Sequence, residues 1–124
     1  MALLSCAEQK REATLEDNLT MYEKAIRWSE FSRASKYLRD PENADIDKLE
    51  GIKVTSYKPT GRDVSEDEQQ IVESVRISYT LTGSQTERTL MDRQIWEYDQ
   101  EKNRWYLTTN LPDFTAASHR GYGR

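Results

Sequence analysis

Residues 71–81 read IVESVRISYTL, and this stretch decides the fold. Large apolar side chains alternate along it with mostly polar ones, at the period of two that is typical of a half-buried β-strand. The apolar set is Ile71, Val75, Ile77, Tyr79 and Leu81. The sequence therefore predicts a strand that turns this set toward the core and turns Ser74, Arg76 and Ser78 away from it.

The residues that follow predict two more strands. A polar gap at 82–85 leads into a strand over 86–98, and the polar turn 99–103 leads into another over 104–111. Because gaps of this length join antiparallel neighbours, the strands are expected to form a meander.

The middle strand of the meander has an irregular pattern. Leu90 and Trp96 share one parity, whereas Met91 and Ile95 share the other. A β-bulge over residues 92–94 would bring both sets to one face, and we therefore expect one there.

The N-terminal part predicts an amphipathic helix from about Leu15 to Leu38. Apolar residues recur at spacings of three to five, as on the buried stripe of such a helix. The stripe is Leu15, Leu19, Tyr22, Ile26, Phe31, Ala34 and Leu38. It slips by one residue between Trp28 and Phe31, so we expect a kink or a break there. Asp40 precedes Pro41, which ends the helical region.

A first strand is expected shortly after this helix. It has Ile52 and Val54 on one face and Thr55 and Tyr57 on the other. Proline, glycine and an acidic run then predict that residues 59–68 are an exposed loop.

Together these elements predict an α+β fold in a single domain over 14–111. A length of 124 residues suits one domain. A twisted four-stranded antiparallel sheet with one apolar face is expected to curl around the N-terminal helix, broken or not, as a half-open cone. Residues 1–13 would form an N-terminal segment and tether, and the aperiodic residues 112–124 a mobile tail.

Composition excludes several classes of function. The net charge is −4 and the basic residues form no run, which argues against a nucleic-acid partner. Cys6 is the one cysteine and His119 the one histidine, so we expect no disulfide, metal site or cofactor.

The acidic residues 63–68 lack the ligand spacing of an EF-hand and are expected to form a solvated loop. No apolar run approaches the roughly twenty residues that span a bilayer.

The N-terminal residues Leu3, Leu4, Ser5 and Cys6 resemble the lipobox of a bacterial lipoprotein signal. In that motif a leucine precedes the cysteine by three residues and a small residue comes just before it. A complete signal also needs a basic start and a longer apolar region upstream of these residues. The resemblance implies lipidation of Cys6 and a membrane tether facing the periplasm, and the alternative is an incidental cysteine at a cytosolic N-terminus.

The order of one helix and four strands, with residues 95–98 (IWEY) and 104–107 (RWYL) in the last hairpin, resembles small bacterial proteins of the nuclear-transport-factor-2-like and cystatin-like superfamily. The resemblance covers roughly residues 12–111. It implies the cystatin-like half-open cone, and members are frequently secreted or lipid-anchored and often dimerise through the exposed sheet face. It does not imply one activity, since the fold hosts isomerases, dehydratases and adaptor modules.

Enzymes of this superfamily usually place an Asp, His or Tyr inside the cone. The candidates on this chain for a pocket are Trp28, Tyr57, Tyr79, Asp92 and Trp96, with Arg93 and Glu97 beside them. A carboxylate in an apolar cone can act as a base and a tyrosine can polarise a carbonyl group, but the same residues can also be ordinary core and edge packing.

Two functions therefore remain open. One is a non-enzymatic envelope lipoprotein that binds a protein partner, a second copy or a small ligand through its sheet or cone. The other is a small isomerase-like or dehydratase-like enzyme that acts on an apolar molecule in the cone.

Overall fold

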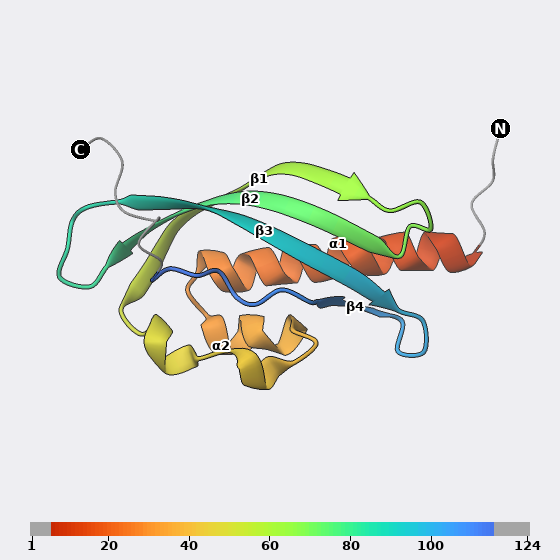
Figure 1. Ribbon diagram of the computed structural model, residues 1–124, viewed down its shortest axis with the longest axis horizontal. Coiled ribbons are helices and arrows are strands. Elements are labelled where there is room, and N and C mark those ends of the chain that lie inside the picture. The colour runs from red at the N-terminus through yellow and green to blue at the C-terminus, as the bar shows by residue number, and fades with distance from the viewer. Residues whose placement is uncertain (1–5, 116–124) are drawn as a thin grey trace.

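The computed structural model describes residues 6–115, which form one long helix, several short helical turns and a four-stranded sheet (Figure 1). In chain order the elements are α1 (Cys6–Arg27), α2 (Phe31–Ala34), the 3-10 turns η1 (Ser35–Tyr37), η2 (Pro41–Asn43) and η3 (Ile46–Leu49), then β1 (Ile52–Val64), β2 (Gln70–Leu81), β3 (Arg88–Asp99) and β4 (Arg104–Leu107). The strands pair antiparallel in the order β1-β2-β3-β4. The predicted α+β fold, with an N-terminal helix packed in a curved four-stranded antiparallel sheet, is confirmed.

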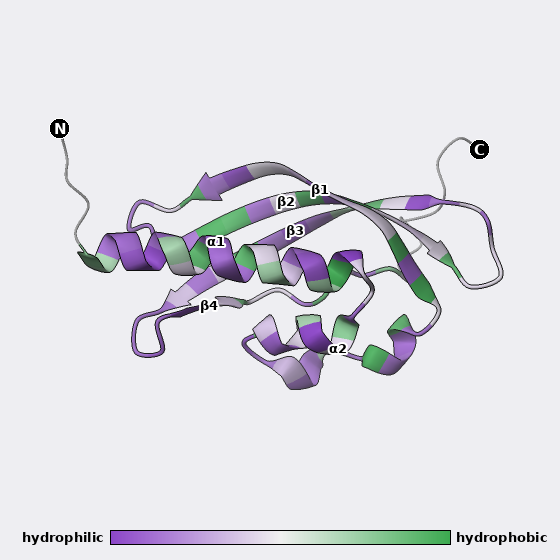
Figure 2. Ribbon diagram, turned by 180° about the vertical axis from the view of Figure 1, so that it is seen from behind, coloured by the Kyte–Doolittle hydropathy of each residue, from purple (hydrophilic) through white to green (hydrophobic). Residues whose placement is uncertain are grey.

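Strand β2 has the orientation that its alternation predicts. Val75, Ile77 and Tyr79 have no exposed surface, whereas Arg76 is exposed. The buried set packs in the same core as Leu19, Tyr22 and Ile26 of α1. Figure 2 shows the matching alternation of hydrophobic and hydrophilic residues along the helix.

The bulge expected over residues 92–94 is absent. Strands β2 and β3 pair without interruption from Gln70 opposite Glu97 to Tyr79 opposite Arg88. Met91 is 58% exposed, so only the even-numbered face of β3 is turned to the core. The prediction was wrong because it required Met91 to be buried, and a strand can leave a single methionine in solvent.

Strand β1 continues through the segment that was expected to be a loop. It runs to Val64 and passes through Pro59, which an edge strand tolerates because one side of its backbone has no strand to pair with. Two irregularities leave Thr55 and Thr60 without Cα partners on β2. The first shifts the alternation by one residue, so Tyr57 lies on the same face as Val54 and not opposite to it.

Helix α1 begins at Cys6 and not near Leu15, because residues 7–13 are mostly good helix formers. Its end at Arg27 confirms the predicted break. Ser29 has a φ of 59°, and its N–H and that of the next residue bond the carbonyls of Ile26 and Ala25, as in a Schellman motif. The Ser29 hydroxyl also accepts a hydrogen bond from the backbone N–H of Val54 in β1.

Beyond β4 the chain remains part of the core. Leu111 and Phe114 are 8% and 3% exposed, so residues 112–115 are not the mobile tail that aperiodicity suggested. Apolar anchors separated by proline and polar residues have no period, and this explains the error. Residues 1–5 and 116–124, which include the rest of the lipobox and His119, lie outside the described residues.

The helices lie on one side of the sheet, and the sheet bends around α1 (Figure 1). No helix of residues 6–115 covers the opposite, convex face of β1–β3 (Figures 1 and 2). Within residues 6–115 no helix has the length and apolar character needed to cross a membrane.

Candidate functional site

A buried polar cluster lies on the concave face of the sheet, with Gln94 at its centre. Gln94 has no exposed surface. Its Nε2 donates to the Tyr57 hydroxyl at 3.0 Å and to Asp92 Oδ2 at 2.9 Å, and its Oε1 accepts from Trp96 Nε1 at 3.0 Å. Asp92, Gln94 and Trp96 share a face because they alternate along β3. The amide uses both its N–H groups and its oxygen, so the polar side chain is stable inside the fold.

Helix α1 adds Tyr22 to this cluster. Its side chain is fully buried, and its ring meets that of Trp96 edge-on with centroids 5.2 Å apart. Its hydroxyl has no hydrogen-bond partner among the described residues. Burial, then the charge of Asp92 and then that of Tyr57, raise the pKa of Tyr22 well above its ordinary value. The phenol therefore stays protonated at neutral pH, and its O–H group donates no hydrogen bond to a described residue.

Tyr57 reaches the cluster from β1. Burial raises the pKa of its phenol well above the ordinary value, although the hydrogen bond from Gln94 opposes the shift. Like Tyr22 it is a proton donor at neutral pH, and the bond from Gln94 leaves its hydrogen available. Two protonated phenols and the carboxylate of Asp92 are thus close together in the core.

An ion pair extends the polar region across β1 and β2. Glu73, which is 5% exposed, lies opposite Gln94 and accepts from Arg62 Nε at 2.8 Å. Arg62 also bonds Glu16 of α1 at 2.7 Å. These bonds raise the pKa of Arg62, with the contact to Glu73 as the largest cause. The charge of Glu73 is therefore compensated, and this trio attaches α1 to the edge of the sheet.

The structure brings together three of the five residues named for a pocket: Tyr57, Asp92 and Trp96. Trp28 is separate from them, 67% exposed beneath the Arg27 guanidinium. Tyr79 is core, and its hydroxyl donates to the Phe114 carbonyl at 3.0 Å.

The two charged residues considered beside that pocket lie elsewhere. Arg93 is exposed on the convex face, and Glu97 pairs with Arg39 at 2.6 Å.

Sequence reasoning missed Gln94 and did not assign Tyr22 to a site. The signal for Gln94 was present, because an uninterrupted strand that buries Leu90 and Trp96 also turns residue 94 inward. The assumed bulge hid it. Nothing in the pattern of the helix marks the Tyr22 hydroxyl as different from other core atoms.

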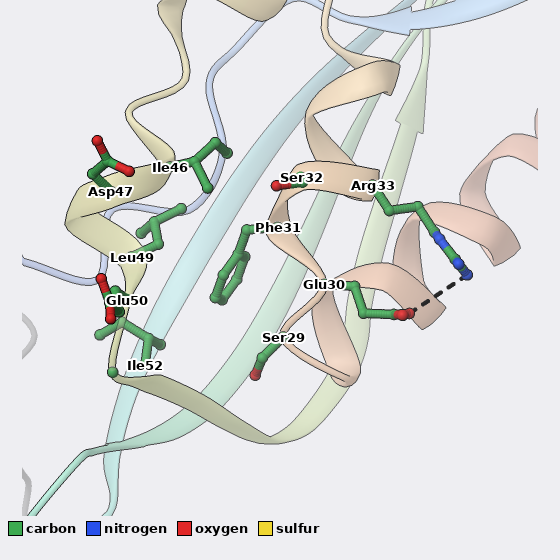
Figure 3. A pocket seen from close by; sticks show the side chains of 11 residues that line it. Ser29, Glu30, Phe31, Ser32, Arg33, Ile46, Asp47, Leu49, Glu50 and Ile52 are labelled. Carbon is green, nitrogen blue, oxygen red and sulfur yellow. Dashed lines mark ion pairs between the residues drawn. The ribbon is translucent and has the colours of Figure 1, made fainter.

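Grooves on the described residues lie away from the cluster, and two of them border α1 or α2. One, of about 560 Å³, is open between α2, η3 and the start of β1, with Phe31, Leu49 and Ile52 along it and an ion pair between Glu30 and Arg33 at its rim (Figure 3). The other, of about 240 Å³, lies between α1 and the β1–β2 end of the sheet. Neither groove is lined by any of the five residues named for a pocket.

The acidic loop between β1 and β2 is held by its own hydrogen bonds. Asp67 Oδ1 accepts from the Ser65 hydroxyl at 2.7 Å and from the Gln69 backbone N–H at 3.1 Å. These two bonds, the first larger, lower the pKa of Asp67. Across the part of the chain that the structure describes, no group of three or more His, Cys, Asp or Glu side chains could hold a metal ion. The absence of metal and cofactor remains a prediction.

Comparison of the chain with protein-family models, curated proteins and solved structures gave no match. The resemblance to the nuclear-transport-factor-2-like and cystatin-like superfamily therefore remains a prediction from sequence.

Proposed function

We propose that this chain is a non-enzymatic binding protein of the bacterial cell envelope, tethered by lipid on Cys6, which recognises its partner through the convex face of the sheet. One observation carries the proposal. Side chains fill the concave face of the sheet, while none of the helices of the described residues covers the convex face (Figure 1).

The packing of the concave face supports a binding role over catalysis in the cone. Tyr22, Gln94 and Trp96 have no exposed surface, and Trp96 is in edge contact with Tyr22 and Tyr37. An enzyme working there would need room for substrate beside these groups. The amide nitrogen and oxygen of Gln94 already make hydrogen bonds inside the protein, as expected for a structural network.

The exposure of Cys6 is compatible with the tether. Cys6 is the first residue of α1 and is exposed, so acyl chains on its sulfur would displace no core side chain. Two or more acyl chains anchor a protein stably where one chain is marginal. Residues 7–13, predicted to be the hydrophilic tether, are part of α1, so the lipid would lie at the end of a helix.

Expression of the gene with its natural upstream region in a bacterial host tests the tether. We expect the mature chain to begin at Cys6, to carry acyl mass and to sediment with membranes. Cys6→Ser should move it to the soluble fraction, whereas Ser32→Ala, at an exposed residue of α2, should change nothing. An unmodified thiol, or identical fractionation of Cys6→Ser and the unaltered chain, would contradict the proposal.

The second candidate is a small enzyme of the cone, and the orphaned hydroxyl of Tyr22 favours it. A substrate carbonyl could accept hydrogen bonds from Tyr22 and Tyr57 while Asp92 removes a proton. This function needs the concave face to open, whereas the binding function needs it to stay closed. A Tyr22→Phe variant separates the two, because loss of the hydroxyl should stabilise a closed core and should not stabilise a face that water or a ligand enters.

A further inference from the structure

Exposed cations gather in the middle of the convex sheet face. Lys58 of β1 lies directly opposite Arg76 of β2, and Arg76 lies opposite Met91 of β3. Arg93 is two residues beyond Met91 on the same face. Because all three cations are exposed, they form a band across three strands. We call Lys58, Arg76 and Arg93 the cationic band.

The band has no internal counter-charge. Within residues 6–115, none of its three members lies within 4.0 Å of a carboxylate, although six ion pairs occur elsewhere in that part of the chain. Like charges directly opposite each other on neighbouring strands destabilise a sheet. The pair Lys58 and Arg76 therefore lowers the stability of a chain whose net charge is −4 and which has carboxylates to spare.

The surroundings of the band suit a narrow occupant. Met91, 58% exposed, lies beside Arg76 and offers an apolar contact. Toward one end of the strands the same face carries Asp63, opposite Val72, and then Glu97, opposite Gln70 and ion-paired with Arg39. A flat anionic surface would approach the carboxylate of Asp63 as well as the cations, and the sheet is bent (Figure 1). An extended chain that crosses the strands at the level of the band avoids both problems.

The spacing of the band also fits an extended peptide. Residues diagonal to each other on adjacent strands, as Arg76 and Arg93 are, have Cα atoms roughly 7–8 Å apart. Alternate side chains of an extended segment recur at roughly 7 Å. Two acidic residues separated by one residue could therefore meet Arg76 and Arg93, while the residue between them points away from the sheet. Lys58, directly opposite Arg76, would share the acidic residue that meets Arg76.

We propose that the cationic band binds an extended acidic segment of a partner protein, in which acidic residues occupy every second position. The inference rests on the proposed binding function and names the chemistry of the partner for the convex face. It does not depend on the lipid, because the band is far along the chain from Cys6 and can be tested on the unacylated protein.

The test uses the purified chain and a fluorescent synthetic peptide of alternating glutamate and valine, followed by fluorescence anisotropy. We expect binding at low salt that weakens as salt rises. The variant K58Q/R76Q/R93Q should lose affinity on the order of tenfold, since each exposed charge pair contributes modestly and three are removed.

A matched variant controls for net charge. K10Q/K24Q/K36Q removes the same charge from exposed lysines of α1 and η1, none of which makes an ion pair with a described residue, and it should bind as the unaltered chain does. Circular dichroism checks that both variants fold. If the triple band variant does not fold, Arg93→Glu alone should give the loss.

Three results would overturn the inference. They are no peptide binding by the unaltered chain at low salt, equal binding by the two triple variants, and a loss in the band variant that appears only with another probe. The other probes are phosphatidylglycerol vesicles, for a membrane surface, and a single-stranded oligonucleotide. Acylation of Cys6 and binding of the acidic peptide are measured separately. If the peptide does not bind while Cys6 is acylated, the acidic partner is wrong and the lipid tether stands.

Discussion

Replacing Tyr22 by phenylalanine tests whether the concave face is a closed core. The substitution removes one oxygen and keeps the ring against Trp96, at a centroid distance of 5.2 Å, and against Tyr37, at 6.2 Å. The hydroxyl is buried and makes no hydrogen bond with a described residue. Leaving such a group unpaired costs about 1–3 kcal/mol. Tyr22→Phe should therefore raise the free energy of unfolding by about that amount.

The assay is urea unfolding at neutral pH, followed by tryptophan fluorescence and circular dichroism. Tyr37→Phe is the matched control, because the Tyr37 ring contacts Tyr22 and Trp96 but the residue is only half-buried. It should change stability by less than about 0.5 kcal/mol.

The advantage of Tyr22→Phe should also grow at alkaline pH. The folded-state pKa of Tyr22 is raised, so above the ordinary tyrosine pKa the phenol ionises in the unfolded chain but not in the folded one. The free energy of unfolding of the unaltered chain therefore falls as the pH rises from the ordinary tyrosine pKa toward the folded-state value, and that of Tyr22→Phe lacks this decrease. An unchanged or lower stability of Tyr22→Phe would show that water or a ligand satisfies the hydroxyl. That result would refute the closed core and favour the enzyme.

Three further predictions follow from the same structure. Ile77→Ala, at a fully buried residue of β2, should lower the free energy of unfolding by about 2–5 kcal/mol, and an unchanged melting temperature would contradict its place in the core. Ser65→Ala should raise the pKa of Asp67 toward its ordinary value in a carboxyl NMR titration, because the Ser65 hydroxyl is the largest cause of the lowering. A carboxyl group with a lowered folded-state pKa stabilises the fold above the unfolded pKa, and this stabilisation is lost as the pH falls through the folded pKa. The variant should therefore lose it at a higher pH than the unaltered chain does. Purified protein should contain no stoichiometric zinc, and elemental analysis that finds one zinc per chain would overturn the expectation.

The strand β2 and the helix stripe were predictable because each buries one face against the other. A period of two or of about 3.6 follows directly from that burial. Val75, Ile77, Leu19 and Ile26 accordingly lie in one core, as their spacing indicates.

The period places residue 94 on the buried face of an uninterrupted strand, but it does not predict the hydrogen bonds of the polar cluster. Burying Gln94 is unfavourable unless its amide finds partners, and those partners come from β1 and from neighbouring positions of β3. A pattern of apolar residues carries no information on such side-chain hydrogen bonds, of which the one to Tyr57 joins two different strands. For this reason the sequence favoured burial of Met91 and Ile95, whereas the structure places Gln94 inside.

Strand β1 shows a second limit. Pro59 and Gly61 are turn signals in most contexts, but here they lie within an edge strand that has two irregularities. The sequence alone does not say which strand becomes the edge, and so the signals were read as a loop.

Hydrogen exchange of the tryptophan indole N–H groups tests most directly the central claim that the concave face is closed. Trp96 Nε1 donates to buried Gln94, whereas Trp28 is 67% exposed and serves as an internal reference. In one-dimensional NMR spectra after transfer to deuterated water, the account predicts that the Trp28 signal disappears at once and that the Trp96 signal persists. Loss of the Trp96 signal as fast as that of Trp28, under conditions where the protein remains folded, would contradict it.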